Sequence, residues 1–126
     1  MRILVIDDEP RVAELIHDTL ESAGHRCLVA RDADEADSML AGGEVDGITV
    51  DLRMPGRDGL VWLEHLAGTR PDLARRCVLL TGSYLQPKEC RRLQDCGATL
   101  LFKPFSLDRL LEVFEGLARD PVGEPS

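Results

Sequence analysis

Gly-Ile-Thr-Val-Asp-Leu-Arg-Met-Pro-Gly-Arg-Asp-Gly, residues 47–59, is the stretch of this sequence that decides its fold. Its first four residues are predicted to form a short buried strand, because they include β-branched residues and show no helical period. Pro55 and Gly56 indicate a turn, since proline pre-sets φ and glycine accepts positive φ. Asp51 therefore lies where a strand ends and a loop begins, the position where open α/β sheets bind ligands. Taken alone, it is more simply a turn former or a helix cap.

Outward from this stretch, short apolar runs alternate with amphipathic segments. Further strands are predicted at residues 2–6, 27–30, 77–80 and 100–102. Helices are predicted from Pro10 to Gly24, around Ala33–Leu40, after Gly59 to about Ala67, from Pro87 to about Cys96, and after a Ser106 cap. Residues 69–72 are predicted to form a turn. This order predicts an α/β fold, a doubly wound five-stranded parallel sheet with five helices, because a barrel would need eight such units.

The composition indicates one domain of ordinary balance. The chain has 126 residues, of which 44 % are apolar and 30 % charged. No apolar run reaches the ~18 residues of a membrane helix, and the apolar start is too short for a signal peptide, so we expect a cytoplasmic protein without a membrane partner. The net charge of −8 argues against direct nucleic-acid binding. The four cysteines form no Cys-x-x-Cys pair and are predicted to be small core residues, not zinc ligands.

Polar side chains stand at the ends of four of the five predicted strands. They are Asp7 with Asp8, Asp51, Thr81 and Lys103. Because parallel strands end at one edge of a sheet, we expect these side chains to lie together. Grouped carboxylates repel one another and need a cation, and Mg²⁺ suits hard oxygen ligands. Each residue alone has an ordinary interpretation as a cap, a turn former or a surface charge, but their joint placement favours a site.

The chemistry of this set favours phosphoryl transfer. The chain has thirteen arginines and two lysines, yet Lys103 follows the last strand. Its ammonium can pair with a carboxylate or a phosphoryl oxygen. Thr81 offers a hydroxyl, and Gly82 leaves space beside it. Aspartate is an established covalent acceptor of phosphoryl groups, and such transfer needs mainly positioning and charge neutralisation.

Four short motifs, in this order and spacing, resemble the receiver domain of two-component response regulators. They are Ile-Asp-Asp-Glu-Pro at residues 6–10, the stretch at 51–59, Leu-Leu-Thr-Gly at 79–82 and Phe-Lys-Pro-Phe at 102–105. The resemblance covers about residues 2–118. It implies a flavodoxin-like sheet of order 2-1-3-4-5, with a receiver domain at 1–119 and a flexible tail or linker stub at 120–126.

The resemblance implies roles for the acidic residues. Asp51 is the expected phosphoacceptor, which takes its phosphoryl group from a histidine kinase or a phosphotransfer protein. Asp8 and Asp51 are the expected direct Mg²⁺ ligands, with Asp7 acting through water and the backbone carbonyl of Arg53 completing the set. The protein is not expected to be an enzyme beyond its own phosphorylation and dephosphorylation at Asp51.

The same resemblance implies a switch. Thr81 resembles the hydroxyl that moves onto the phosphoryl group, and Lys103 resembles the residue that pairs first with Asp51 and then with phosphate. The Lys103-Pro104 bond is expected to be cis, as is typical of the family. One departure is Leu100, where the family often has an aromatic residue that links threonine movement to output. The output surface on the fourth helix, fifth strand and fifth helix is therefore left open.

Three alternatives stand beside this interpretation. A pseudo-receiver would bind partners without phosphorylation, but the five polar residues at the strand ends are all present. A haloacid-dehalogenase-type phosphohydrolase needs Asp-x-Asp-x-Thr, whereas Asp51 is followed by Leu52 and Arg53. A flavodoxin would cradle phosphate with amides and hydroxyls, which residues 7–9, Asp-Asp-Glu, would repel. The sequence names neither the kinase nor the output.

Overall fold

The structure is a computed structural model that describes residues 1–54, 56–82 and 84–119. Pro55 of the predicted turn, Ser83 and the predicted tail at 120–126 lie outside these residues. The elements, in chain order, are β1 (Arg2–Ile6), α1 (Pro10–Ser22), β2 (Arg26–Ala30), α2 (Ala33–Gly42), β3 (Gly47–Asp51), α3 (Gly59–Thr69), α4 (Pro71–Ala74), β4 (Cys77–Thr81), α5 (Pro87–Cys96), β5 (Thr99–Phe102) and α6 (Leu107–Arg119).

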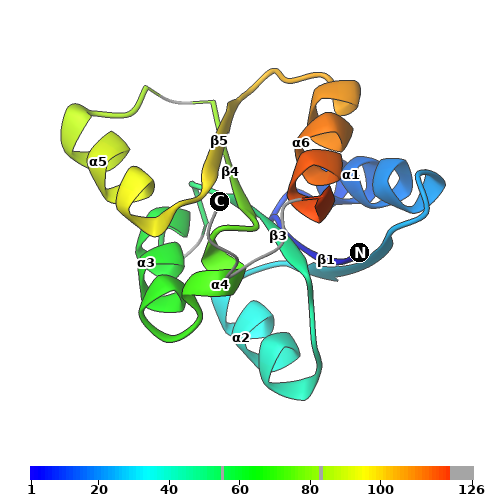
Figure 1. Cartoon of the computed structure of the whole chain (residues 1–126), viewed down its shortest axis with the longest axis horizontal. Coiled ribbons are helices and arrows are strands. Elements are labelled where there is room, and N and C mark those ends of the chain that lie inside the picture. The colour runs from blue at the N-terminus through cyan, green and yellow to red at the C-terminus, as the bar shows by residue number, and fades with distance from the viewer. Residues whose placement is uncertain (55, 83, 120–126) are drawn as a thin grey trace.

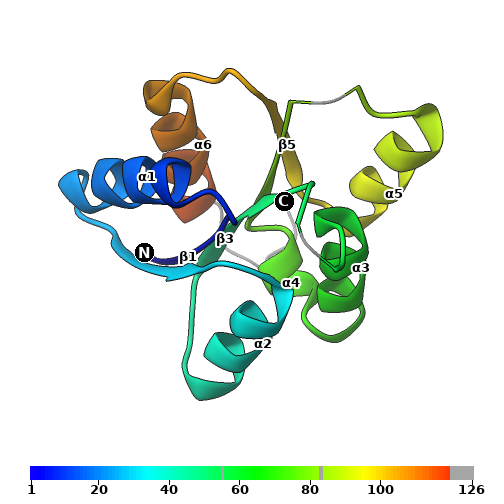
Figure 2. The same cartoon turned by 180° about the vertical axis from the view of Figure 1, so that it is seen from behind.

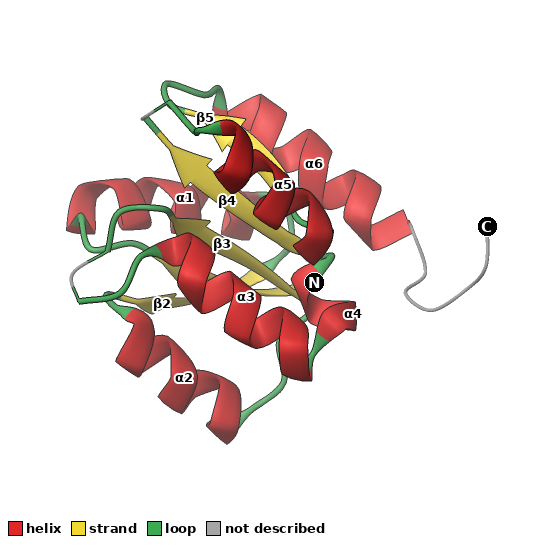
Figure 3. Cartoon of the chain, turned by 90° about the vertical axis from the view of Figure 1, so that its left-hand side faces the viewer, coloured by secondary structure: helices red, strands yellow, loops and turns green. Residues whose placement is uncertain are grey.

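The five strands form one parallel sheet in the order β2-β1-β3-β4-β5. Figure 3 shows α2, α3 and α5 on one face of this sheet, with α1 and α6 on the other. Figures 1 and 2 show α1 beside α6, whereas α5 lies at the opposite corner, next to β5. The predicted doubly wound, flavodoxin-like architecture is confirmed.

The prediction of five helices is wrong, because the structure contains a short sixth helix, α4, within the described residues. The segment from Thr69 to Asp72 was expected to be a turn. Instead Pro71 occupies the first helical position, where its missing N–H costs nothing. Leu73 and Ala74 are buried in the core beneath α3. The helical conformation buries both side chains against the core, so tertiary packing supports the helix here.

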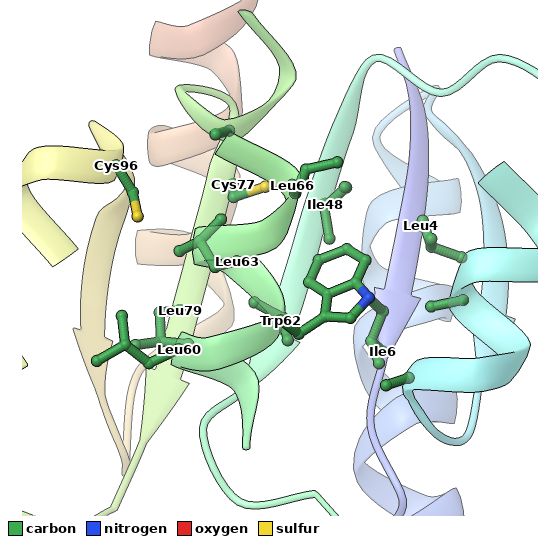
Figure 4. Close-up of a cluster of buried hydrophobic side chains, with 14 of the residues drawn as sticks. Leu4, Ile6, Ile48, Leu60, Trp62, Leu63, Leu66, Cys77, Leu79 and Cys96 are labelled. Atoms are coloured by element: carbon green, nitrogen blue, oxygen red, sulfur yellow. The ribbon is translucent and has the colours of Figure 1, made fainter. Parts of the chain in front are cut away.

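Two apolar cores lie on the two faces of the sheet, because buried strands direct alternate side chains to opposite sides. On the α2–α3–α5 face, β1 and β3 contribute Leu4 and Ile48, which pack around Trp62 and Leu63 of α3 (Figure 4). On the other face, the largest buried side chain is Phe114 of α6. Helices α1 and α6 close that side.

Cysteine placement follows the prediction. All four cysteines are free thiols, with Cys77 and Cys96 buried and Cys27 and Cys90 half-buried. No helix in the described ranges is both long enough and apolar enough to cross a bilayer.

The helix ends have local causes that the sequence carries. Asp58 accepts a hydrogen bond from the backbone N–H of Val61 at 2.8 Å and so caps α3. Ser106, the predicted cap of the last helix, accepts one from Arg109 N at 3.0 Å. Gly97 ends α5 with φ of 79°, a left-handed conformation that glycine adopts without a Cβ penalty. Asp58 and Ser106 thus mark where two loops at the polar edge of the sheet end, whereas Gly97 lies at the opposite edge, before β5 begins.

Candidate functional site

The predicted polar residues meet at one edge of the sheet. Asp7 directly follows β1, Asp51 is the last residue of β3, and Lys103 directly follows β5. Carboxylate oxygens of Asp7, Asp8 and Asp51 lie within 4.8 Å of one another. Lys103 Nζ donates to Asp51 Oδ2 over 2.9 Å. The sheet topology therefore gathers residues that are separated by almost the whole chain.

Asp51 is held in place by its neighbours and by the loop that follows it. Its side chain is 8 % exposed, and Oδ1 accepts a hydrogen bond from Arg53 N at 3.1 Å. Leu52 N donates to Leu80 O of β4 at 2.9 Å, and Gly59 N donates back to Leu52 O at 2.7 Å. The loop from Leu52 to Gly59 is thus closed at its base.

Gly59 is a site-forming residue whose role sequence reasoning missed. A Cβ at this position would lie closer to the carbonyl oxygen of Asp51 than real Cβ atoms come, and 3.0 Å from the carbonyl carbon. Only glycine lets the start of α3 approach the backbone of Asp51 in this way. The sequence offered one signal, a glycine immediately before a predicted helix, where no left-handed turn requires it.

Asp7 is the most deeply buried of the three acids, at 1 % exposure. Its Oδ1 accepts a hydrogen bond from Glu9 N at 2.9 Å. Its Oδ2 is buried without a hydrogen-bond partner among the described residues. Burial raises the pKa of Asp7 above its ordinary value, and the nearby Asp51 and Asp8 carboxylates raise it further, against the lowering by the Glu9 hydrogen bond and Lys103. The site is short of positive charge.

Lys103 supplies one cation to this site. Burial lowers the pKa of its ammonium, but the hydrogen bond and charge of Asp51, together with Asp7 and Glu9, outweigh burial and leave the pKa above its usual value. Lys103 is therefore charged at neutral pH. One ammonium faces three carboxylates, so the described site retains an excess of negative charge.

The residues present fit a hard divalent cation. A buried, unpartnered Asp7 oxygen beside two further carboxylates is the kind of donor set that Mg²⁺ binds, completed by water and a phosphate. Asp8 is exposed and so accessible from solvent. Arg53, whose backbone carbonyl is the other predicted ligand, lies in the loop two residues after Asp51. The individual ligand roles stay predictions.

Thr81 and Lys103 come from neighbouring strand ends on the other side of Asp51. Thr81 is fully buried, and its backbone carbonyl accepts a hydrogen bond from Lys103 N at 2.7 Å. Gly82 leaves room at this point, since among the described residues a Cβ there would meet only Lys103 Cβ, at 3.7 Å. The Lys103–Pro104 peptide is cis, as expected. The structure thus brings a hydroxyl-bearing residue and an ammonium to the same end of the sheet.

The position that departs from the family pattern is occupied by a core residue. Leu100 is half-buried and packs against the core on the α3–α5 face. The aromatic side chains nearby in sequence point elsewhere, with Phe102 54 % exposed and Tyr84 82 % exposed. Neither substitutes for an aromatic residue at position 100.

Comparison with known proteins agrees with this geometry. The family model described as the response regulator receiver domain matches residues 3–115, nearly all of the chain that the structure describes. This chain belongs to the response regulator receiver family. Its parallel sheet and its acidic edge are those of a receiver domain.

Individual relatives place this receiver among signalling proteins. Response regulator MprA of Mycobacterium tuberculosis is 34 % identical over 119 residues, which cover 94 % of this chain and 51 % of MprA. The C4-dicarboxylate transport transcriptional regulatory protein DctD of Rhizobium meliloti is 35 % identical over 113 residues, covering 87 % of this chain and 24 % of DctD. The chain spans about half of the length of MprA, and less of DctD.

A solved structure supports the same assignment. The crystal structure of the receiver domain of NtrX from Brucella abortus superposes with a TM-score of 0.80 at 30 % identity, covering 91 % of this chain and 96 % of that one. This superposition supports the receiver fold over most of the chain.

Proposed function

We propose that this receiver accepts a phosphoryl group on Asp51 and acts as a phosphorylation-controlled switch in the cytoplasm. The observation that carries this proposal is the contact of Lys103 Nζ with Asp51 Oδ2 at 2.9 Å, beside the carboxylates of Asp7 and Asp8. An acceptor carboxylate, a counter-charge and a metal-type donor set coincide there. The four free thiols agree with a reducing compartment.

The transfer step needs little covalent chemistry from the protein. A carboxylate oxygen of Asp51 attacks the phosphorus of a phosphohistidine, the P–N bond breaks, and the departing imidazole takes up a proton. The product is an aspartyl phosphate. The phosphoryl group is later lost by hydrolysis: water attacks the phosphorus, the P–O bond to Asp51 breaks, and inorganic phosphate leaves. This is self-modification at one site and not turnover of an external substrate.

Mg²⁺ bound among Asp7, Asp8 and Asp51 would neutralise charge that develops on the phosphoryl oxygens. The residues of the chain position the acceptor. Burial of Asp51 excludes water from much of its surface, and the hydrogen bond from Arg53 N fixes one of its oxygens. Lys103 then exchanges its bond to the free carboxylate for one to the new phosphoryl group.

The switch arises because phosphorylation of Asp51 adds new hydrogen-bond acceptors to the site. A phosphoryl group on Asp51 adds acceptor oxygens close to the ends of β4 and β5. We assign Thr81 the role of donating its hydroxyl to one of them. Because Thr81 ends β4 just before the loop into α5, a shift of this residue moves the chain that leads into that helix.

The donor proposed is a histidine kinase or a phosphotransfer protein. The output is a partner protein or a further domain. Support for the output comes from the relatives, whose printed names describe a response regulator and a transcriptional regulatory protein and whose chains extend well beyond the matched part. The acidic net charge of −8 favours a protein partner over direct nucleic-acid contact.

The deciding experiment is intact-mass measurement after incubation with acetyl phosphate, with and without Mg²⁺. Wild type is expected to gain one phosphoryl group only with Mg²⁺, and Asp51→Ala is expected to gain none. The matched control is Asp58→Asn, which alters another carboxylate of the same loop while keeping a side chain that caps α3.

Two results would contradict the assignment. Phosphorylation of Asp51→Ala at the wild-type level would place the acceptor elsewhere. A wild-type protein that binds Mg²⁺ but takes no group, either from acetyl phosphate or from its kinase, would favour the phosphorylation-independent pseudo-receiver.

A further inference from the structure

A carboxylate on α2 connects the loop after Asp51 to the helix that follows it. Asp37 Oδ1 accepts a hydrogen bond from Trp62 Nε1 at 2.8 Å, and its Oδ2 accepts one from the Arg57 guanidinium at 2.8 Å. Trp62 is the chain's only tryptophan and is 2 % exposed. Figure 4 shows its indole nitrogen directed towards Ile6 of β1. The Asp37 carboxylate thus accepts hydrogen bonds from both the buried indole N–H of Trp62 and the guanidinium of Arg57 in the loop.

The loop from Leu52 to Asp58 is fixed unevenly. Its base is closed by the hydrogen bond from Gly59 N to Leu52 O, and Leu52 and Met54 are buried. The outer part has less support, because Gly56 is exposed and turns with φ of 82°. Of the described residues in that outer part, Arg57 is the one whose side chain forms a hydrogen bond with another element, α2.

We propose that Asp37 is a positioning residue for the phosphorylation site. By holding Arg57, it fixes the loop that also carries Arg53, whose N–H binds Asp51 Oδ1 and whose backbone carbonyl is a predicted Mg²⁺ ligand. This inference rests on the proposed function for what the loop serves, but the loop's anchoring itself is independent of phosphorylation. Loss of the Asp37–Arg57 contact frees the outer loop and weakens Mg²⁺ binding.

Simple charge effects predict a different pattern from anchoring. Removal of the negative Asp37 near a cation site lowers cation affinity, whereas removal of the positive Arg57 raises it. Anchoring predicts that both changes lower it, since either one breaks the same contact. Anchoring also predicts that the double variant is no worse than the worse single variant, because the contact can be lost only once.

The test uses the whole chain with Asp37→Asn, Arg57→Gln and the double variant. Asparagine keeps an oxygen for the Trp62 N–H, so the buried indole retains an acceptor. The matched control is Asp34→Asn. Asp34 lies on the same helix and lines the same surface hollow as Arg57, yet it makes no hydrogen bond or ion pair within the described residues.

Two measurements read the result. Hydrogen exchange of the peptide spanning residues 52–58, without metal, reports the loop directly. Calorimetric titration with Mg²⁺ alone reports the site. Half-exposed ion pairs shift equilibria by small factors. In Asp37→Asn, Arg57→Gln and the double variant we therefore expect hydrogen exchange to be about two- to fivefold faster and Mg²⁺ binding to be about two- to fivefold weaker. Asp34→Asn should stay near wild type in both measurements.

The outcomes separate the two proposals. Unchanged exchange in Asp37→Asn and Arg57→Gln, or tighter Mg²⁺ binding in Arg57→Gln, overturns the positioning role. If wild type binds no Mg²⁺ and takes no phosphoryl group, the proposed function fails, while faster loop exchange in the variants would still show that Asp37 anchors the loop. If Arg57→Gln unfolds the protein, Asp37→Asn and the exchange data carry the test.

Discussion

Helices α3 and α5 lie side by side on one face of the sheet, yet they are held very differently. α3 buries five of its eleven residues, Gly59, Leu60, Trp62, Leu63 and Leu66. α5 buries two of its ten residues, Leu93 and Cys96. Helices with few buried apolar contacts open locally at low free energy. The loop after Asp51, the proposed phosphoacceptor, therefore leads into a firmly packed helix, and the loop after Thr81 leads into a weakly packed one.

One ion pair joins the two helices. Arg92 Nε donates to Glu64 Oε2 at 2.9 Å, and the other guanidinium nitrogen donates to Glu64 Oε1 at 2.5 Å. The two side chains are 40 % and 35 % exposed, so water screens much of the attraction. This arrangement suits the proposed switch, because the loop that carries Asp51 stays fixed while the adjacent helix α5 can move at low energetic cost. The predictions below test that contrast, beginning with the largest effect.

Truncation of one leucine in each helix should separate the two regions. Leu63→Ala leaves a cavity between α3 and the sheet and is expected to cost ~2–5 kcal/mol of unfolding free energy. Leu93→Ala should cost less in urea denaturation, because the sparsely packed α5 can close around the gap, but it should speed hydrogen exchange in α5 selectively. Equal costs, with equal exchange changes in both helices, would remove the contrast.

A matched glycine pair tests the helix ends that define the same contrast. Gly59→Ala forces a methyl group against the Asp51 backbone, and overpacking of this kind costs about 1–3 kcal/mol. Gly97→Ala imposes a left-handed residue and crowds Arg75 Cγ at 3.1 Å, for about 1–2 kcal/mol. Thermal unfolding gives both costs.

The phosphorylation rate distinguishes the two glycine variants. Only Gly59→Ala should slow phosphorylation by acetyl phosphate, because only it displaces the acceptor backbone. Slower phosphorylation of Gly97→Ala, with the rate of Gly59→Ala unchanged, would contradict the assignment of α3 as the firmly held helix next to Asp51.

Glu64→Gln should weaken the link between the helices by about 0.2–1 kcal/mol, the range for exposed ion pairs. The loss is expected to appear as faster amide exchange in α5, with α3 nearly unchanged. Asp95→Asn, which removes an exposed charge from α5 itself, is the control. Faster exchange in α3 than in α5 would contradict this prediction, because it would show that the ion pair mainly stabilises α3.

Acidification provides the smallest and most selective test. The hydrogen bond from Arg92, with its charge, lowers the pKa of Glu64 below the ordinary 4.5 despite partial burial. A lowered pKa in the folded state means that the stabilisation is present above about 4.5 and is lost as pH falls through the folded value. The difference in unfolding free energy between wild type and Glu64→Gln should therefore shrink as pH falls from 7 to about 3 in urea titrations. A difference that grows on acidification would contradict this sign.

Much of the local structure was readable from the sequence because its causes are local. Apolar runs marked the strands, Ser106 and Gly97 marked helix ends, and turn-forming residues marked loops. The short helix α4 escaped prediction, since Pro71 suits both a turn and a first helical turn. The burial of Leu73 and Ala74 in the folded protein favours the helix. Gly59 and Asp37 also escaped attention, because a close backbone approach and a cross-helix contact leave no local pattern.

The sequence by itself determined the alternation of strands and helices, and with it the rule that polar residues at strand ends share one edge. Their gathering was predictable because parallel strands all end on the same side. The tertiary structure decided which oxygen of Asp7 lacks a partner, how closely Gly59 meets Asp51, and which helix is held loosely. Those properties depend on distances between segments far apart in the chain, which packing sets and residue order alone does not.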